Sequence, residues 1–240
     1  MNLQENIAAV QARIRAAALR AGRDPSEITL VAATKVQTSQ TIRAAIAAGV
    51  QICGENRVQE MAAHLDDDAY AGARLHFIGH LQTNKVKQVV GRVDLIESVD
   101  SEHLLQAINK RAEELEMVQD ILLEVNIAGE ESKGGISPEQ LPALARKALE
   151  FPHVRLRGLM CIPPVVGTGG SNRNFFAQTR QLFVDIRTKI ADNNTDMDCL
   201  SMGMSGDFED AVEEGATLVR VGTALFGPRA PMPGADTQKR

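Results

Sequence analysis

The sequence predicts an α/β protein: a single-domain (β/α)8 TIM barrel with an extra N-terminal helix. Short apolar, partly β-branched runs alternate with helical patterns from end to end. Eight such units within 240 residues match this barrel better than an open doubly wound sheet, and they leave little room for a second domain. Aromatic residues are only 3% of the chain, so Ala, Val, Ile and Leu must fill the interior, as in parallel sheets.

The first element is an amphipathic helix. Leu3, Ile7, Val10 and Ile14 recur at spacings of four, three and four residues and share one face. The eight predicted strands follow, each an apolar run bounded by turn or helix patterns. They cover residues 28–34, 50–54, 74–79, 93–99, 120–126, 154–161, 197–201 and 218–221.

Helical patterns follow the strands. Gly49 ends the first of them, and Pro138 opens a later one, because its fixed φ suits the start of a helix. We expect these helices at 39–48, 58–65, 84–90, 102–115, 138–149, 175–190 and 207–214.

The domain is expected to span residues 1–227. The Pro- and Gly-rich residues 228–240 form a tail that we expect to be disordered. Residues 163–171, PPVVGTGGS, are expected to form a mobile loop over the face of the barrel that binds ligands.

Composition excludes several classes of protein. The net charge of −5 and the lack of a basic block argue against nucleic acid as a partner. Three cysteines stand far apart with no C-x-x-C pair, and no other residues have metal-ligand spacing, so we expect neither disulfides nor a metal site. The N-terminus lacks the apolar core of a signal peptide, and no span reaches 18 apolar residues. We expect a cytoplasmic protein with no membrane partner.

Lys35 is the most informative residue. It ends the apolar run 28–34, which would place its amine at the mouth of the barrel. An amine whose pKa is lowered by burial can attack an aldehyde and form a Schiff base. A lysine that merely reaches solvent at a strand end is the alternative.

Two segments after the seventh and eighth predicted strands carry groups that suit a phosphate. Residues 201–207, SMGMSGD, combine hydroxyls and small residues just before a helix, and residues 220–223, RVGT, add a cation, a glycine and a hydroxyl. In this fold the loops after these strands frequently bind phosphate. Simple helix capping by Ser205 is the alternative for the first segment, and a structural ion pair is the alternative for Arg220.

Because the eighth and first strands adjoin in a closed barrel, one small molecule could reach both the amine and the phosphate site. An aldehyde with a phosphate arm fits, and pyridoxal 5′-phosphate (PLP) is such a molecule.

The chain resembles the PLP homeostasis proteins, single-domain relatives of the alanine racemase barrel. The resemblance runs from about Ile7 to Gly227. Its motifs are LVAATK, GENRVQE, HFIGHLQTNK, EVNIAGEESKGGI, RGLMCIPP, SMGMSGDFEDAV and VRVGTALFG. Cys53, where an apolar or aromatic residue is expected, and Gly206, where an acidic one is common, depart from the pattern.

The resemblance implies that Lys35 carries PLP as an internal aldimine. It implies that the SMGMS and VGT segments hold the phosphate, and that Asn56 and Arg220 lie near the pyridine ring. From the residues alone, Asn56 could equally be a turn former. The implied cofactor-binding residues are Lys35, Asn56, Ser201, Gly203, Met204, Ser205, Arg220, Gly222 and Thr223; no catalytic residue is implied.

Two function classes fit this pattern. A PLP-binding protein of vitamin B6 homeostasis would carry the cofactor without substantial turnover, with PLP-dependent apo-enzymes as candidate partners, and we expect a monomer. A PLP-dependent amino-acid racemase or related fold-type III enzyme would need a second acid or base. The single tyrosine, Tyr70, precedes the third strand and is expected away from the cofactor, so we favour homeostasis. A phosphate-sugar enzyme on the same barrel would explain the phosphate loops but would make less use of Lys35.

Overall fold

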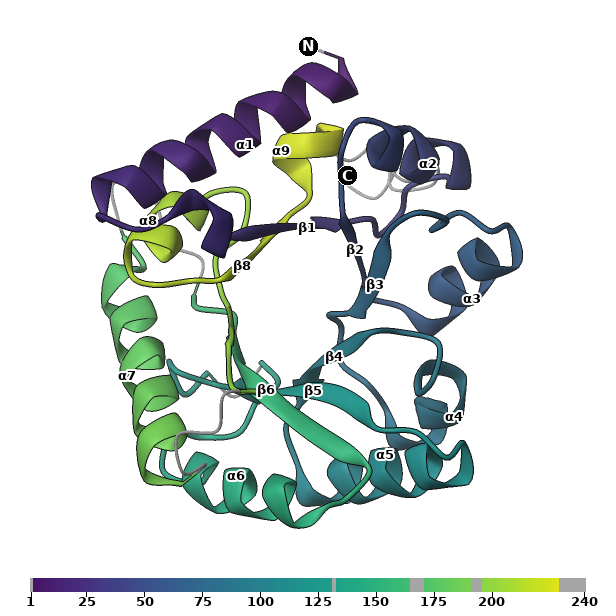
Figure 1. The fold of residues 1–240 in the computed structure, drawn as a ribbon, viewed down its shortest axis with the longest axis vertical. Coiled ribbons are helices and arrows are strands. Elements are labelled where there is room, and N and C mark those ends of the chain that lie inside the picture. The colour runs from purple at the N-terminus through teal and green to yellow at the C-terminus, as the bar shows by residue number, and fades with distance from the viewer. Residues whose placement is uncertain (1, 131–132, 165–170, 191–195, 229–240) are drawn as a thin grey trace, which may run out of the picture.

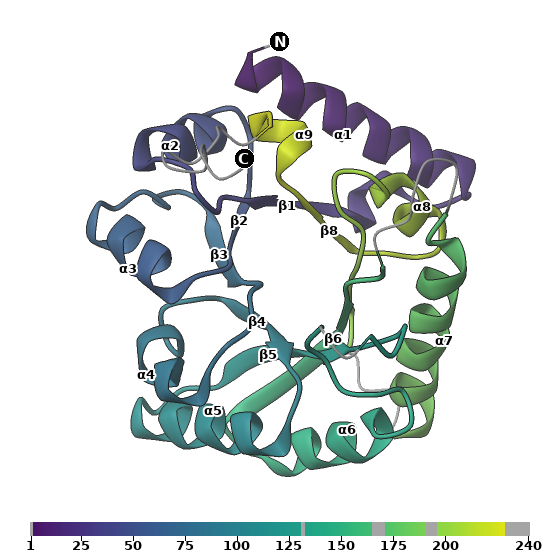
Figure 2. The ribbon, with the colours of Figure 1, turned by 180° about the vertical axis from the view of Figure 1, so that it is seen from behind.

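The computed structural model describes residues 2–130, 133–164, 171–190 and 196–228. Eight parallel strands close into one barrel in chain order, with β8 paired back to β1. Helices surround the ring of strands in both end-on views (Figures 1 and 2). The predicted (β/α)8 barrel with an additional N-terminal helix is therefore confirmed.

The strands lie within two residues of the predicted bounds. They are β1 (Thr29–Ala33), β2 (Ile52–Glu55), β3 (Arg74–Phe77), β4 (Leu95–Val99), β5 (Gln119–Val125), β6 (Val154–Cys161), β7 (Cys199–Ser201) and β8 (Leu218–Val221).

The helices begin with α1 (Leu3–Arg20), which precedes the barrel. The others are α2 (Ser39–Ala47), α3 (Val58–Asp66), α4 (Val86–Val89), α5 (Glu102–Glu114), α6 (Leu141–Glu150), α7 (Arg173–Lys189), α8 (Phe208–Glu213) and α9 (Thr223–Phe226). Two short 3-10 turns, η1 (Pro25–Glu27) and η2 (Thr83–Lys85), precede β1 and α4.

Two of the expected helices differ from the prediction. The helix expected from Pro138 begins at Leu141. A start at Pro138 would place Pro142 beyond the first turn, where its missing N–H and its ring would break the helix; the observed start puts it in the first turn. The helix expected over 84–90 is the 3-10 turn η2 followed by the four-residue α4.

Buried apolar residues form two layers because successive side chains of a strand point to opposite faces. The larger layer fills the space between the strands and the helices. The smaller layer lies inside the barrel and is made of one residue from each of six strands: Val31, Ile52, Leu95, Leu122, Met160 and Leu218. Aliphatic side chains of this size fill a barrel interior that bulky aromatics would crowd.

The additional helix α1 joins the two ends of the barrel domain. Its buried face carries Ile7, Val10 and Ile14, as the periodicity predicted. Asn6 Nδ2 donates to the carbonyl of Leu225 in α9 at 2.8 Å, and Arg13 pairs with Glu209 of α8 at 2.7 Å. Figure 1 shows α1 lying across α8 and α9, so it covers the outside of the β8–β1 closure.

Some predicted segments fall outside the described residues: residues 165–170, which form most of the loop expected to be mobile, and residues 229–240 of the expected tail. Within the part of the chain that the structure describes, no helix has the length and apolar character needed to cross a membrane.

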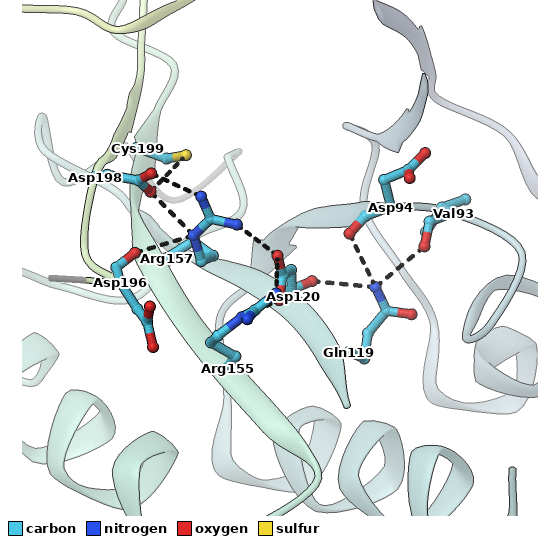
Figure 3. A network of polar contacts seen from close by, with 9 residues as sticks. All are labelled: Val93, Asp94, Gln119, Asp120, Arg155, Arg157, Asp196, Asp198 and Cys199. Carbon is cyan, nitrogen blue, oxygen red and sulfur yellow. Dashed lines mark hydrogen bonds and ion pairs between the residues drawn. The ribbon is translucent and has the colours of Figure 1, made fainter. Parts of the chain in front are cut away.

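An ion-pair network lies at the end of the barrel where the strands begin (Figure 3). Asp120 on β5 accepts hydrogen bonds from Arg155 at 2.6 and 3.0 Å and from Arg157 at 2.6 Å, both on β6. Arg157 also reaches Asp198, before β7, at 2.7 and 3.0 Å. These hydrogen bonds raise the pKa of Arg157. The network ties three adjacent strands together at the end away from the ligand-binding face.

Replacing Arg157 by Met should lower the free energy of unfolding by about 1.5–3 kcal/mol, because the largely buried carboxylate of Asp120 and the exposed one of Asp198 both lose a charged hydrogen-bond donor. The matched change Arg155→Met should cost about 1 kcal/mol or less, since that side chain is 47% exposed against 26% for Arg157. Urea denaturation measures both. Equal losses of unfolding free energy in the two variants would contradict the central position of Arg157 in the network.

Candidate functional site

A cavity of about 260 Å³ opens at the end of the barrel where the strands finish. This is the face at which (β/α)8 barrels bind their ligands. Its wall is made of residues at or just after the ends of β1, β2, β3, β6, β7 and β8. They are Ala33, Lys35, Asn56, Ile78, Ile162, Met204, Ser205, Gly206, Arg220, Gly222 and Thr223.

Lys35 reaches this wall between two anchored neighbours. Thr34 is fully buried, and its hydroxyl donates to Glu55 Oε1 at 2.6 Å. Val36 has a φ of 60°, a left-handed conformation that is unusual for a β-branched residue, and its N–H donates to Glu60 Oε2 at 3.0 Å. The backbone on both sides is thereby fixed, so the lysine starts from a defined point at the cavity.

Glu55 and Tyr70 lie outside the cavity wall, in the layer between strands and helices. Cys53, two residues before Glu55, packs in that layer, and alternate residues of a strand share a face. The Tyr70 hydroxyl donates to Glu55 Oε1 at 2.9 Å and lies 3.1 Å from His64 Nδ1. Burial and the charge of Glu55 raise the pKa of Tyr70, which keeps it a neutral phenol. Tyr70 does not line the cavity, but its hydroxyl meets the same Glu55 oxygen as Thr34, the residue before Lys35, so it lies nearer the ends of the strands than its place before β3 led us to expect.

Ser205 joins the loops after β7 and β8. Its hydroxyl oxygen accepts the backbone N–H groups of Gly222 and Ala224, both at 3.2 Å. Because its oxygen accepts both N–H groups, the Ser205 hydroxyl has its own proton to donate, and a hydroxyl donor at a cavity wall suits a phosphate or another anion. The loop after β7 and the loop after β8 are therefore brought together as the sequence predicted.

The alternative that Ser205 caps the following helix is wrong. Helix α8 begins at Phe208, and Asp207 occupies the N-cap position. Asp207 Oδ1 accepts the N–H of Met204 at 2.7 Å, which closes the turn and leaves the Ser205 hydroxyl directed at the loop after β8.

Gly203 and Ser201 lie behind the wall rather than in it. Gly203 has a φ of 88°, and a Cβ there would lie 2.9 Å from Phe208 Cα, so only glycine fits. Its carbonyl accepts the N–H of Arg220 at 3.0 Å. Ser201 is fully buried. Both predicted residues thus support the β7–β8 wall and do not line the cavity.

Arg220 lines the cavity and is held by a buried polar chain inside the barrel. Its guanidinium donates to Ser201 Oγ at 2.5 Å and to the carbonyl of Cys161 at 2.8 Å. Ser201 donates to Glu97 Oε2 at 2.5 Å, and His76 Nδ1 lies 2.7 Å from Glu97 Oε1. Arg220 is therefore both a cation in the cavity wall and the partner of a buried carboxylate.

The charge of Glu97 is stabilised against its burial. Burial alone would raise its pKa, but hydrogen bonds from His76 and Ser201 and the charge of Arg220 outweigh this and hold the pKa of Glu97 below its ordinary value. Arg220 NH1 lies 4.0 Å from Glu97 Oε2. Because a guanidinium keeps its proton, the pair is charged on both sides.

Asn56 contributes a buried polar atom with no partner among the described residues. Its Oδ1 accepts no hydrogen bond there, although buried polar atoms are nearly always bonded in folded proteins. Gly79 lets the Asn56 backbone approach closely, since a Cβ on Gly79 would lie 2.1 Å from the Asn56 carbonyl oxygen. An unpartnered amide in a cavity wall is a group that a ligand would satisfy.

Sequence reasoning missed Glu97 and Glu124. Both are inward-facing acidic residues within apolar strands, in the stretches LIESV and ILLEV. The sequence did hold one signal for them: each is a charged residue in a run that otherwise predicts a fully buried strand. A buried carboxylate is usually either paired with another group or part of a functional site. The described residues contain no cluster of three or more His, Cys, Asp or Glu that could hold a metal ion.

Residues 3–230 match the family model described as alanine racemase, N-terminal domain. A protein of Aquifex aeolicus named pyridoxal phosphate homeostasis protein is 44% identical over 95% of this chain and 99% of its own length. A protein of Pseudomonas aeruginosa with the same name is 41% identical, with coverage of 95% and 96%.

A solved structure is also similar. PipY of Synechococcus elongatus PCC7942, solved with PLP bound, matches with a TM-score of 0.80 and 32% identity over 94% of this chain and 100% of its own.

The fold and the cavity define a class of protein: (β/α)8 barrels whose mouth holds a cavity lined by a lysine after β1 and by the loops after β7 and β8. Within that class, the chain belongs to the pyridoxal phosphate homeostasis protein family, whose barrel is that of the alanine racemase N-terminal domain.

Proposed function

We propose that the chain binds PLP at the barrel mouth, with the aldehyde carbon joined to Lys35 and the phosphate held by the loops after β7 and β8. One observation carries this proposal. A single cavity is lined both by Lys35, after β1, and by Gly222 and Thr223, after the neighbouring β8. The amine and the anion site lie on adjacent strands, as one molecule with an aldehyde and a phosphate arm requires.

The other lining residues fit the same group. Ser205 and Met204 belong to the phosphate side of the wall, Asn56 offers an unpartnered amide oxygen, and Arg220 offers a fixed cation. We assign Asn56 and Arg220 to the ring of the cofactor. When bound, PLP would supply an electrophilic carbon and an electron-accepting ring. A cation held beside the ring nitrogen would disfavour its protonation and weaken that ring as an electron acceptor.

The role that we propose is vitamin B6 homeostasis: the protein carries PLP in the cytoplasm without substantial turnover, as a monomer, and PLP-dependent apo-enzymes are its candidate recipients. Family membership supports this role. So does the cavity wall, because the described residues that line it include no Tyr, His, Asp or Glu. Racemisation of an amino acid requires, besides the lysine, a second acid or base close to the reacting carbon.

Amino-acid racemisation is the second candidate, favoured by the match to the alanine racemase barrel. On the homeostasis proposal, homogeneous protein loaded with PLP should racemise alanine only in trace amounts, because a missing acid or base costs roughly 10²–10⁴ in rate. Chiral chromatography of the amino acid after incubation measures this. Turnover at tens per second, roughly the range of ordinary enzymes, would favour amino-acid racemisation over homeostasis as the function.

Borohydride reduction of the protein with PLP should fix the cofactor to one peptide, the one containing Lys35, because the amine of that residue lines the cavity. Peptide mass spectrometry locates the label. Lys35→Ala should abolish labelling while some PLP stays bound through its phosphate. A label on Lys85 or Lys133 would contradict the placement.

Ser205→Ala combined with Thr223→Val should weaken PLP much more than pyridoxal, which lacks the phosphate. Each lost charge-assisted hydrogen bond costs about 1.5–3 kcal/mol, roughly ten- to hundredfold in affinity. Ser201→Ala is the matched control: Ser201 contacts Arg220 behind the wall, so its loss should affect both ligands alike. Fluorescence titration gives the dissociation constants. Equal losses of both ligands in the double variant would exclude these loops as the phosphate site.

A further inference from the structure

Lys35 lies at the centre of a short turn that is held at both ends. The N–H of Gln37 donates to the carbonyl of Thr34 at 3.0 Å, so Lys35 is one of the two central residues. The Thr34 hydroxyl donates to Glu55 Oε1 at 2.6 Å. The carbonyl of Gln37 lies 3.1 Å from Nε2 of His64, on α3. Both ends of the turn thus contact side chains that lie outside the cavity wall.

Glu55, His64 and Tyr70 form one buried cluster beside this turn. The Tyr70 hydroxyl lies 2.9 Å from Glu55 Oε1 and 3.1 Å from His64 Nδ1, and the last two atoms are 3.3 Å apart. Glu55 is fully buried, Tyr70 is 6% exposed, and the His64 side chain is 12% exposed. The cluster therefore links the two ends of the Lys35 turn through side chains of β2, of α3 and of the segment after α3.

The hydrogen bonds of this cluster need one proton more than a carboxylate, a phenol and a neutral imidazole supply. The Gln37 carbonyl can only accept, so His64 Nε2 carries a proton, and in a neutral imidazole Nδ1 then has none. The single hydroxyl proton of Tyr70 can be given to Glu55 or to His64, but not to both. With one further proton, on His64 Nδ1 or on Glu55, all of these bonds form.

The surroundings of the cluster favour this additional proton. Glu55 Oε2 is buried and accepts no hydrogen bond from a described residue, and an incompletely compensated carboxylate is costly in a protein interior. Burial raises the pKa of Cys53 to about 12 and also raises the pKa of Tyr70, so both stay neutral. The proton is thus shared by Glu55 and His64.

The charged groups on the flanking helices α2 and α3 have other partners. Glu60, on α3, accepts the N–H of Val36 at 3.0 Å, and Asp66, at the end of that helix, is largely exposed. Arg43, the one charged residue of α2, donates to the carbonyl of Asp67 at 2.9 Å. Whether the additional proton is bound is therefore set by the members of the cluster themselves.

We propose that His64 is a positioning residue for Lys35: in the protonated cluster it holds the turn so that the lysine amine is directed at the aldehyde carbon of the cofactor. The inference rests on the proposed function, because it presumes that PLP is joined to Lys35. His64 does not line the ligand cavity, and it acts through the backbone of the turn. Reaction rates fall steeply when the reacting atoms are misplaced. When the cluster loses its additional proton, one bond is lost and the turn gains freedom.

The first test compares the unchanged protein with His64→Leu, each prepared without cofactor and then mixed with PLP. Loss of the bond to the Gln37 carbonyl should slow the joining of PLP to Lys35 by roughly 10–10², measured by stopped-flow absorbance of the imine. The affinity for 4-deoxypyridoxine 5′-phosphate, which has the phosphate but no aldehyde, should change by less than about twofold. The reason is that the residues of the cavity wall are untouched.

Two further variants separate this bond from general support of the fold. A glutamine amide can supply the N–H group that His64 offers to the Gln37 carbonyl, so His64→Gln should recover most of the rate. His153→Leu is the matched control. His153 Nδ1 also lies 3.1 Å from a backbone carbonyl, that of Met117, but it precedes β6 at the other end of the barrel, so its loss should leave the rate unchanged.

The pH dependence tests the additional proton. Deprotonation of the Lys35 amine affects the unchanged protein and His64→Gln alike, so the ratio of their rates reports on the cluster alone. A glutamine amide takes up no proton. The unchanged protein should therefore be faster by roughly fivefold at low pH, about the contribution of one hydrogen bond, and the ratio should fall towards one as the pH rises.

Four results would overturn the proposal: a loss of affinity for 4-deoxypyridoxine 5′-phosphate as large as the loss of rate, His64→Gln as slow as His64→Leu, an equal loss in His153→Leu, or a rate ratio that is the same at every pH. If His64→Leu does not fold, the ratio for His64→Gln still decides. A Lys35 that borohydride leaves unlabelled would remove the proposed function and this inference together. A labelled Lys35 with any of the four results would remove this inference alone.

Discussion

The buried guanidinium of Arg220 is the interaction on which the interior of this barrel depends. An arginine keeps its charge when it is buried, so the fold must supply an anion and enough acceptors around it. Glu97 supplies the charge, Ser201 stands between the two, and His76 completes the chain. These residues come from β3, β4, β7 and β8, so this series of hydrogen bonds forms only when four strands of the barrel meet in register. Removing one partner would leave a buried charge without compensation, which typically costs several kcal/mol.

The two ends of the barrel use polar groups differently. Where the strands begin, Asp120, Arg155 and Arg157 form a network of paired charges. Where they finish, two groups are available to a ligand: the Asn56 amide oxygen has no partner in the described structure, and the Ser205 hydroxyl, whose oxygen accepts two backbone N–H groups, has its proton to donate. The end with paired charges ties neighbouring strands together. The end with the cavity has hydrogen-bonding groups left over for a ligand. The hydrogen-bonded residues Arg220, Ser201, Glu97 and His76 lie between the two ends of the barrel, and they hold the Arg220 guanidinium in place at the cavity.

Much of the fold and part of the site could be predicted from the sequence. Strand and helix periodicity gave the elements to within a few residues, because burial on one or both faces dictates the spacing of apolar positions. Residues just after strands, such as Lys35 and Gly222, could be placed because strand ends share one face of a barrel. The role of Ser201 was harder to predict. The last residue of a strand can face either the cavity or the layer below it, and only the closed barrel shows that Ser201 contacts Arg220. Glu97 and Glu124 each sit alone in an apolar strand, and the groups that decide their states come from other strands, which no local pattern reveals.

The conformation of Val36 has a consequence for how tightly the site can hold a ligand. A β-branched residue with a φ of 60° is costly, of order 1–3 kcal/mol, and it persists because surrounding contacts, among them the bond from its N–H to Glu60, over-determine it. The chain meets this cost once, when it folds. The backbone that carries Lys35 then has little freedom left to lose when a molecule arrives, so less of the interaction energy is spent on ordering it. An unfavourable backbone angle one residue from the amine thus acts as preorganisation: it exchanges some stability of the folded protein for affinity at the site.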